Sequence, residues 1–257
     1  MRKIFVIGIG TGDPDHMTMQ AIKALNQVDV FFIPDKGIEK SALRDLRISI
    51  CERFIENAGY RTVGVDVPQR ATSGDYLTGV EEWHGRLAGI YGDLFQRELG
   101  ENQVGAVLVW GDPAIYDSTL RIIERLRASG LALEFEVIPG ISSVQVLAAK
   151  HRIALNRIGE SVLLTTGRKL ADGFPKEAGS VVVLLDGVQA FAALADQDLE
   201  IFWGAYLGTD YEILRSGKLA DVKDEIAAVR KQARERHGWI MDTYLLRKSG
   251  DLHAEFS

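Results

Sequence analysis

The chain has 257 residues, of which 46% are hydrophobic and 26% are charged, and its formal net charge is -6. This composition is typical of a globular protein of one large or two small domains, and it argues against nucleic-acid binding because no run of Lys and Arg offsets the acidic surface. No stretch of about 18 apolar residues predicts a membrane span. Because the first residues read directly as a strand, without a signal-peptide pattern, we expect a cytoplasmic protein.

Strands and helices alternate in the first half of the chain. Residues 3–10 form a continuous apolar run that predicts a buried strand, and residues 18–27 show helical spacing. Further strands are predicted at residues 28–34, 60–68, 106–113 and 133–140, and further helices at residues 40–57, 75–99 and 119–128. This alternation predicts a mainly parallel sheet with helices on both faces.

The second half of the chain is richer in strands. They are predicted at residues 161–167, 180–187, 199–208, 212–217 and 239–248. A last helix over residues 223–236 is expected to bury Val222, Ile226, Val229 and Ala233. We therefore predict an α/β protein of two domains. Residues 1–141 form the parallel α/β domain, and residues 142–257 form an α+β domain with mixed or antiparallel pairing.

Cysteine and histidine predict neither a disulfide nor a metal site. Cys51 is the single cysteine, and we expect an inert, buried thiol. The histidines show no metal-ligand spacing and are expected at surface or cap positions; they are His16, His84, His151, His237 and His253.

The stretch "GIGTGDPDHMT", residues 8–18, follows the first predicted strand. A dinucleotide fingerprint would place its third glycine at residue 13, which is Asp13, and the phosphate-loop pattern is absent as well. Two later strands also end in conspicuous turns, "VWGDPAIYDS" and "VIPGISSVQ". Ligands of open α/β sheets bind beyond the carboxyl ends of the strands, so we expect the three turns to form one rim. Each turn alone is also compatible with a purely structural role.

These three turns, in this order, resemble those of the tetrapyrrole methylase family, which methylates uroporphyrinogen and the precorrins with S-adenosyl-L-methionine. The resemblance extends from about Arg2 to Arg247, and Thr11 stands where proline is usual. Several stretches are most similar to the subgroup that methylates precorrin-5 at C-1 and releases acetate: "DKGIEKSALRDLRISIC", "VWGDPAIYDSTLRI", "WGAYLGT" and "WIMDTYLLR".

The resemblance implies a homodimer and a cofactor folded in a cleft between the two domains. It implies that S-adenosyl-L-methionine is lined by Thr11, Trp110, Gly111, Asp112, Ile115, Ser142, Ser143, Leu185 and Gly208. Asp112 is suited to the amino group or the ribose of the cofactor. Loss of the acetyl group needs a general base, for which Asp13, Tyr116 and Asp117 are candidates.

A substrate with many carboxylates needs local positive charge on this acidic protein. Lys40, Arg44 and Arg47 recur at i, i+4 and i+7 and predict a basic helix edge beside the apolar residues Leu43, Leu46, Ile50 and Phe54. We expect Lys36, Lys40 and Arg44 to contact the substrate, although cations at the edge of a packed helix have the same pattern. A methyltransferase acting at another precorrin position, a dinucleotide-dependent oxidoreductase and a non-catalytic binding module remain alternatives.

Overall fold

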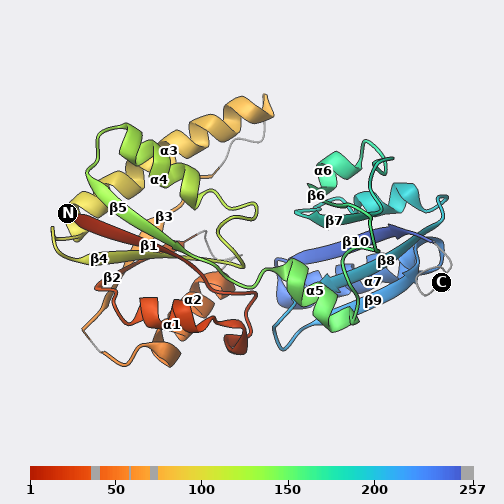
Figure 1. Ribbon diagram of the computed structural model, residues 1–257, viewed down its shortest axis with the longest axis horizontal. Coiled ribbons are helices and arrows are strands. Elements are labelled where there is room, and N and C mark those ends of the chain that lie inside the picture. Colours follow the sequence, from red (N-terminus) through yellow and green to blue (C-terminus); the bar gives the residue numbers. More distant parts are fainter. Residues whose placement is uncertain (36–40, 58, 70–74, 250–257) are drawn as a thin grey trace. The chain divides into compact units, whose positions relative to one another are not determined.

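The computed structural model describes residues 1–35, 41–57, 59–69 and 75–249. The chain divides into two compact units, Met1–Ser142 and Ser143–Ser257. Each unit has its own five-stranded sheet and its own helices (Figure 1). The predicted α/β class, with one parallel and one mixed sheet, is confirmed.

The first unit contains a fully parallel sheet in the order β3-β2-β4-β1-β5. Its strands are β1 (Arg2–Gly8), β2 (Val30–Asp35), β3 (Arg61–Asp66), β4 (Val104–Val109) and β5 (Leu133–Ile138). The helices are α1 (Met19–Leu25), α2 (Ser41–Phe54), α3 (Tyr76–Glu98) and α4 (Thr119–Ala128), and the short 3-10 helix η1 spans Pro14–His16. Figure 1 shows α1 and α2 on one face of this sheet and α3 and α4 on the other.

The two faces of the first sheet follow from the alternation of side chains along a strand. In β1, Ile4 and Val6 pack against α3 and α4, whereas Phe5 and Ile7 pack against α1 and α2. All four are buried, so β1 reads in the sequence as a continuous apolar run. The buried Cys51 belongs to the α1/α2 face, as expected, and burial raises the pKa of its thiol to about 12.

The second unit contains a mixed sheet in the order β6-β7-β10-β8-β9. Its strands are β6 (Val162–Thr166), β7 (Ser180–Leu184), β8 (Leu199–Ala205), β9 (Ile213–Lys218) and β10 (Asp242–Lys248). Its helices are α5 (Ser143–His151), α6 (Gly167–Leu170) and α7 (Leu219–His237), and the 3-10 helix η3 spans Ala190–Leu194. Among the described strands of this unit, only β6 and β7 pair in parallel, which gives the predicted mixed pairing.

The helix predicted at residues 223–236 is longer than expected and buries a different set of residues. It begins at Leu219, and its buried positions include Ile226 and Ala233 but not Val229, which is half-buried. The buried residue next to Val229 is Arg230, whose guanidinium pairs with Asp242. A hydrophobic pattern cannot identify this position, because its burial depends on a carboxylate contributed by β10.

Candidate functional site

The three turns predicted to form one rim are in direct contact in the first unit. Gly10, after β1, and Gly111, after β4, form an isolated antiparallel bridge in which each backbone N–H donates to the other residue's carbonyl, at 3.3 and 2.7 Å. The turn after β5 joins them, because the N–H of Gly140 donates to Asp112 Oδ2 at 2.9 Å. The prediction that these strand ends meet is therefore confirmed.

Glycine is required where the three backbones approach one another. A Cβ on Gly8 would lie 2.5 Å from the nitrogen of Gly140, and a Cβ on Gly140 would collide with the carbonyl oxygen of Gly111. Gly10 and Gly111 also have φ values of +72° and +69°, which side-chain-bearing residues rarely adopt. The result is a rim at which the three backbones are in contact, without Cβ atoms at Gly8, Gly10, Gly111 and Gly140.

Asp112 holds this rim together through both of its carboxylate oxygens. Besides the bond from Gly140, its Oδ1 accepts the N–H of Ala114 at 2.8 Å. The neighbouring cofactor candidates Trp110 and Ile115 are half-buried, while Thr11 and Ser142 are buried. The sequence predicts that Asp112 contacts a ligand, and the structure adds that it organises two of the three turns.

The β1 turn brings together three polar side chains, one of which was not among the candidates. Asp13 caps η1 by accepting the N–H of Asp15 at 2.9 Å. Its Oδ2 lies 3.7 Å from Nε2 of His16, and Nδ1 of the same imidazole lies 3.3 Å from Oγ1 of Thr11. His16 thus stands between a candidate base and a candidate cofactor contact. In the sequence it carries no recognisable spacing, so only the fold of the turn identifies it.

The other two candidate bases follow β4. Tyr116 has a φ of +50° and is 45% exposed, and partial burial raises the pKa of its phenol. Asp117 accepts the N–H of Thr119 at 2.7 Å and so starts α4. Ser118, between Asp117 and α4, lies 2.8 Å from Nε2 of His84. His84 is buried rather than at the expected surface position, because α3 carries it against this turn.

The three remaining cofactor candidates, Ser143, Leu185 and Gly208, lie in the second unit. Strands β7 and β8 run parallel to each other on either side of β10, so their carboxyl ends share one edge. Leu185 follows β7, is 64% exposed and has a φ of +54°, and Gly208 follows β8 with a φ of +76°. Ser143 begins α5, and its Oγ accepts a hydrogen bond from Thr243 at 2.9 Å.

The Leu185 turn is fixed by the residue that follows it. Asp186 is buried and accepts hydrogen bonds from Tyr244 Oη at 2.6 Å and from the N–H groups of Val188 and Ala190. A carboxylate held by three donors keeps the turn in one conformation. The hydrogen bonds of Asp186 therefore hold Leu185 in its exposed, positive-φ conformation.

The predicted basic edge on α2 is only partly described and partly wrong. Lys36 and Lys40 lie outside the described residues. Arg44 is half-buried and pairs with Asp45 and Asp35, at 3.2 and 3.1 Å, and these hydrogen bonds raise its pKa. Arg47 is buried and does not belong to an exposed edge. Arg47 lies at helical spacing from the apolar residues Leu43, Ile50 and Phe54, and this spacing favours a buried position for it.

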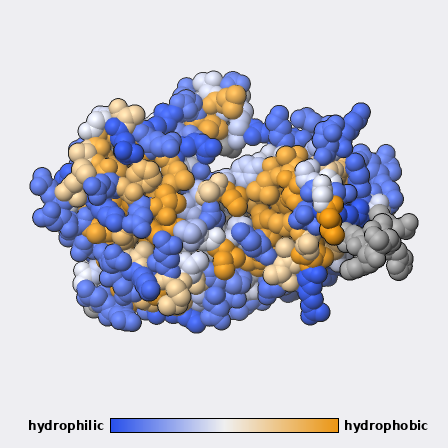
Figure 2. Space-filling view, in the orientation of Figure 1, coloured by the Kyte–Doolittle hydropathy of each residue, from blue (hydrophilic) through white to orange (hydrophobic). Residues whose placement is uncertain are grey.

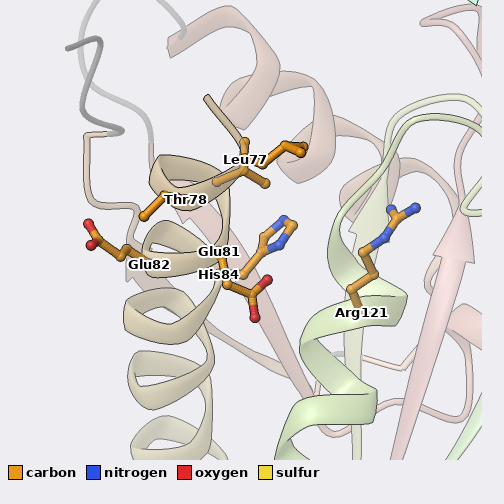
Figure 3. Close-up of a pocket in the computed structure, with 7 residues that line it drawn as sticks. Leu77, Thr78, Glu81, Glu82, His84 and Arg121 are labelled. Carbon is orange, nitrogen blue, oxygen red and sulfur yellow. The ribbon is translucent and has the colours of Figure 1, made fainter. Parts of the chain in front are cut away.

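A separate hollow of about 500 Å³ lies between α3 and α4. Figure 3 shows His84, from α3, and Arg121, from α4, on its two sides. Its lining residues contact the turn after β4 at two points: Arg121 Nη1 donates to the carbonyl of Asp117 at 3.2 Å, and His84 Nε2 lies 2.8 Å from Oγ of Ser118. Within the described part of the chain, no group of three or more His, Cys, Asp or Glu residues could hold a metal ion, and no helix is long and apolar enough to cross a membrane.

Comparisons with known proteins agree with this geometry. Residues 3–223 match the model of the family described as Tetrapyrrole (Corrin/Porphyrin) Methylases. The chain is 54% identical over 253 residues to a precorrin-6A synthase [deacetylating] from Sinorhizobium sp, covering 98% of this chain and 97% of that protein.

Solved structures give the same result. A cobalamin synthesis related protein (CobF) from Corynebacterium diphtheriae superposes with a TM-score of 0.83 at 40% identity, covering 96% of this chain and 99% of that chain. The uroporphyrin-III C-methyl transferase from Thermus thermophilus, in complex with S-adenyl homocysteine, has a TM-score of 0.57 at 19% identity, over 99% of this chain and 100% of that chain. This more distant likeness shows the fold.

Proposed function

Because this chain belongs to the tetrapyrrole (corrin/porphyrin) methylase family, we propose that it is an S-adenosyl-L-methionine-dependent methyltransferase of cobalamin biosynthesis. Its reaction is that of precorrin-6A synthase (deacetylating): methylation of precorrin-5 at C-1 with release of acetate. The observation that carries this proposal is the 54% identity to a precorrin-6A synthase over 98% of the chain.

The rim of the first unit fits a cofactor that approaches backbone closely. Gly8 and Gly140 leave no room for a Cβ, and Gly111 has a positive φ. Thr11 and Asp112 bring a hydroxyl and a carboxylate to the same rim. We propose that these turns, with Trp110, Ile115 and Ser142, hold S-adenosyl-L-methionine, together with Ser143, Leu185 and Gly208 of the second unit. When bound, this cofactor supplies an electrophilic methyl group on a sulfonium.

The chain's own residues have two tasks in this reaction. Alignment of the donor with a nucleophilic ring carbon requires a rigid rim, which the Asp112 hydrogen bonds and the Gly10–Gly111 bridge provide. The acetyl group then leaves when the oxygen of water bonds to its carbonyl carbon, the bond to the ring breaks and its electron pair passes to the ring. A base must take the proton from that water.

We propose that the base lies in the turns after β1 and β4. Asp117 already accepts the N–H of Thr119 through one oxygen, and burial raises the pKa of Tyr116, so each is a constrained candidate. Asp13 with His16 is the third candidate, supported by their 3.7 Å separation and by the 3.3 Å contact between His16 and Thr11. A histidine beside a carboxylate is a common arrangement for moving a proton.

The decisive assay supplies methyl-labelled cofactor and precorrin-5 and measures both products. We expect S-adenosylhomocysteine and acetate in equal amounts, with one oxygen of acetate drawn from labelled water. Methyl transfer without acetate would reject the deacetylating reaction and favour methylation at another position. Absence of any methyl transfer would reject the proposal as a whole.

Three substitutions separate the candidate bases. Among His16→Gln, Tyr116→Phe and Asp117→Asn, the variant that removes the base slows acetate release more than methyl transfer. Equal slowing of both steps by all three would mean that these residues only position the macrocycle. Binding of S-adenosylhomocysteine, measured by calorimetry, serves as the control for an intact rim.

A homodimer and a cytoplasmic location complete the proposal. The second unit exposes Leu163 and Leu164, 40% and 36%, on β6, which is an edge strand, and Figure 2 shows apolar residues (orange) gathered on the visible face of this unit. Sedimentation velocity at micromolar concentration tests the dimer, and a single monomeric species would contradict it. Cell fractionation tests the location.

A further inference from the structure

The first sheet opens at its carboxyl edge between β2 and β4. These strands pair from Val30↔Gly105 to Phe32↔Val107 and no further, although β2 continues alongside β3 to Asp35 and β4 continues alongside β1 to Val109. The carbonyl of Val109 accepts from Ile9 on the β1 side, so the carbonyl of Leu108 faces the opening.

Arg47 fills this opening from α2. Its Nε donates to the carbonyl of Leu108 at 2.9 Å, in the place where β2 would have donated, and its Nη1 donates to the carbonyl of Leu43 at 2.7 Å. The charge of Asp117, in the turn after β4, also acts on the guanidinium and opposes the lowering of its pKa by burial. The guanidinium therefore lies within the sheet edge, and only 7% of the residue is exposed.

This buried cation has no carboxylate partner among the described residues. No described Asp or Glu oxygen lies within 4.0 Å of it, and three of its five N–H groups make no hydrogen bond within the described chain. Nη2 is not fully enclosed, since it is absent from the fully buried unpartnered atoms of the described residues. Asp117, whose charge acts on the guanidinium, makes no ion pair with it and accepts the N–H of Thr119 through Oδ1.

The free energy cost of burying this cation is only partly offset in the free protein, through the charge of Asp117 and without an ion pair. Buried guanidinium groups are normally neutralised, and the planar fork of arginine matches a carboxylate through two parallel hydrogen bonds. Arg47 keeps its charge near neutral pH even though burial lowers its pKa. Its place at the carboxyl edge of a parallel sheet is where ligands of such folds bind.

We propose that Arg47 is a carboxylate-binding residue of the active site. The inference rests on the proposed function, which provides two sources of the same chemistry: a carboxylate side chain of the tetrapyrrole and the released acetate. In either case the anion completes the charge balance in the opening between β2 and β4. The charge of Asp117, which also follows β4, acts on Arg47, so this subsite lies near one of the candidate bases.

The direct test uses acetate as the probe and needs no turnover. The Arg47 Nε–H signal is identified in nitrogen-15 spectra by its loss in Arg47→Lys. We expect that signal in the wild-type protein to shift saturably with acetate and not with chloride at equal ionic strength. A signal that does not move, or that moves equally with chloride, would overturn the proposal. Because this test needs no methyl transfer, it is decided even if the proposed reaction fails.

Kinetics with precorrin-5 distinguish the two sources. If Arg47 binds the tetrapyrrole, Arg47→Gln raises its KM about tenfold or more, while the KM of S-adenosyl-L-methionine is unchanged. If Arg47 binds released acetate, the KM stays the same and inhibition by added acetate is lost. A folded variant that shows neither effect would contradict the proposal.

Two controls cover folding and charge. Arg47→Lys keeps a donor for the carbonyl of Leu108, so it folds if Arg47→Gln does not, and it is expected to retain part of the binding. Arg97→Gln removes an exposed cation from the end of α3 and should change neither acetate binding nor KM. Circular dichroism and S-adenosylhomocysteine binding confirm an intact first unit.

Discussion

Asp112 accepts a hydrogen bond from the backbone N–H of Gly140 across 28 residues of chain, at 2.9 Å. This bond joins the turn after β4 to the turn after β5, on either side of β1. The second oxygen of Asp112 accepts the N–H of Ala114, so one carboxylate fixes its own turn and a neighbouring turn. The shape of the proposed cofactor rim therefore depends on a single side chain.

Asp112→Ala is expected to weaken both folding and cofactor binding. It leaves the N–H groups of Gly140 and Ala114 without an acceptor, which should lower the free energy of unfolding by about 1–3 kcal/mol. Distortion of the rim should raise the dissociation constant of S-adenosylhomocysteine about tenfold or more. Urea unfolding and calorimetry measure the two effects. Asp93→Ala, on the exposed face of α3, is the control, and an unchanged dissociation constant would reduce Asp112 to a turn residue.

Gly140→Ala tests the close approach of the three backbones. The added Cβ would collide with the carbonyl oxygen of Gly111 and lie 2.8 Å from the carbonyl carbon of Gly8, so backbone must shift. We expect a loss of about 1–3 kcal/mol in unfolding free energy and a larger proportional loss of S-adenosylhomocysteine binding. Gly64→Ala in β3, where a Cβ meets nothing within 4 Å, should leave binding unchanged. Normal binding by Gly140→Ala would contradict the prediction.

The buried pair Arg230–Asp242 is expected to stabilise the second unit only as a pair. Its Nε–Oδ2 distance is 2.9 Å, and Trp203 Nε1 donates to the same oxygen at 3.1 Å. Burial raises the pKa of Asp242, and Arg230 opposes that shift. Arg230→Met should therefore cost about 3–5 kcal/mol, because it leaves Asp242 buried with the Trp203 hydrogen bond but without an opposite charge. The double variant Arg230→Met/Asp242→Leu should recover much of this loss; no recovery in urea unfolding would show that packing of Arg230 dominates.

Stability is expected to fall as the pH drops below about 6.5, in part through His84. Burial, followed by the charges of Arg125 and Arg121, lowers the pKa of this imidazole. The unfolded chain then takes up a proton at a higher pH than the folded chain does, so the contribution is present above about pH 6.5 and is lost as the pH falls. Between pH 7.5 and pH 5.5, the melting temperature of His84→Gln should fall by less than that of the wild type. His151, whose pKa burial also lowers, accounts for part of the remaining dependence.

The sequence by itself determined the order of the strands and helices along the chain. It also determined that the turns after β1, β4 and β5 meet. Unbroken apolar runs such as residues 3–10 require burial on both faces, and alternation with helices then requires a parallel sheet. In such a sheet the carboxyl ends of all strands lie at one edge, so the residues after β1, β4 and β5 had to come together. The "GDP" and "PGISS" turns carried enough local pattern for the family to be identified.

Only the tertiary structure decided which polar groups face one another. The helical period placed Arg47 between a basic edge and an apolar stripe, and the opening between β2 and β4 determined that it is buried. Likewise, Arg230 is buried because β10 brings Asp242 to it, and His16 contacts Thr11 because η1 folds the chain back. Periodicity fixes the direction in which a side chain points. The group that it pairs with belongs to a strand or turn elsewhere in the chain. Because the free energy of burying a charge depends on that group, the sequence pattern alone does not predict it.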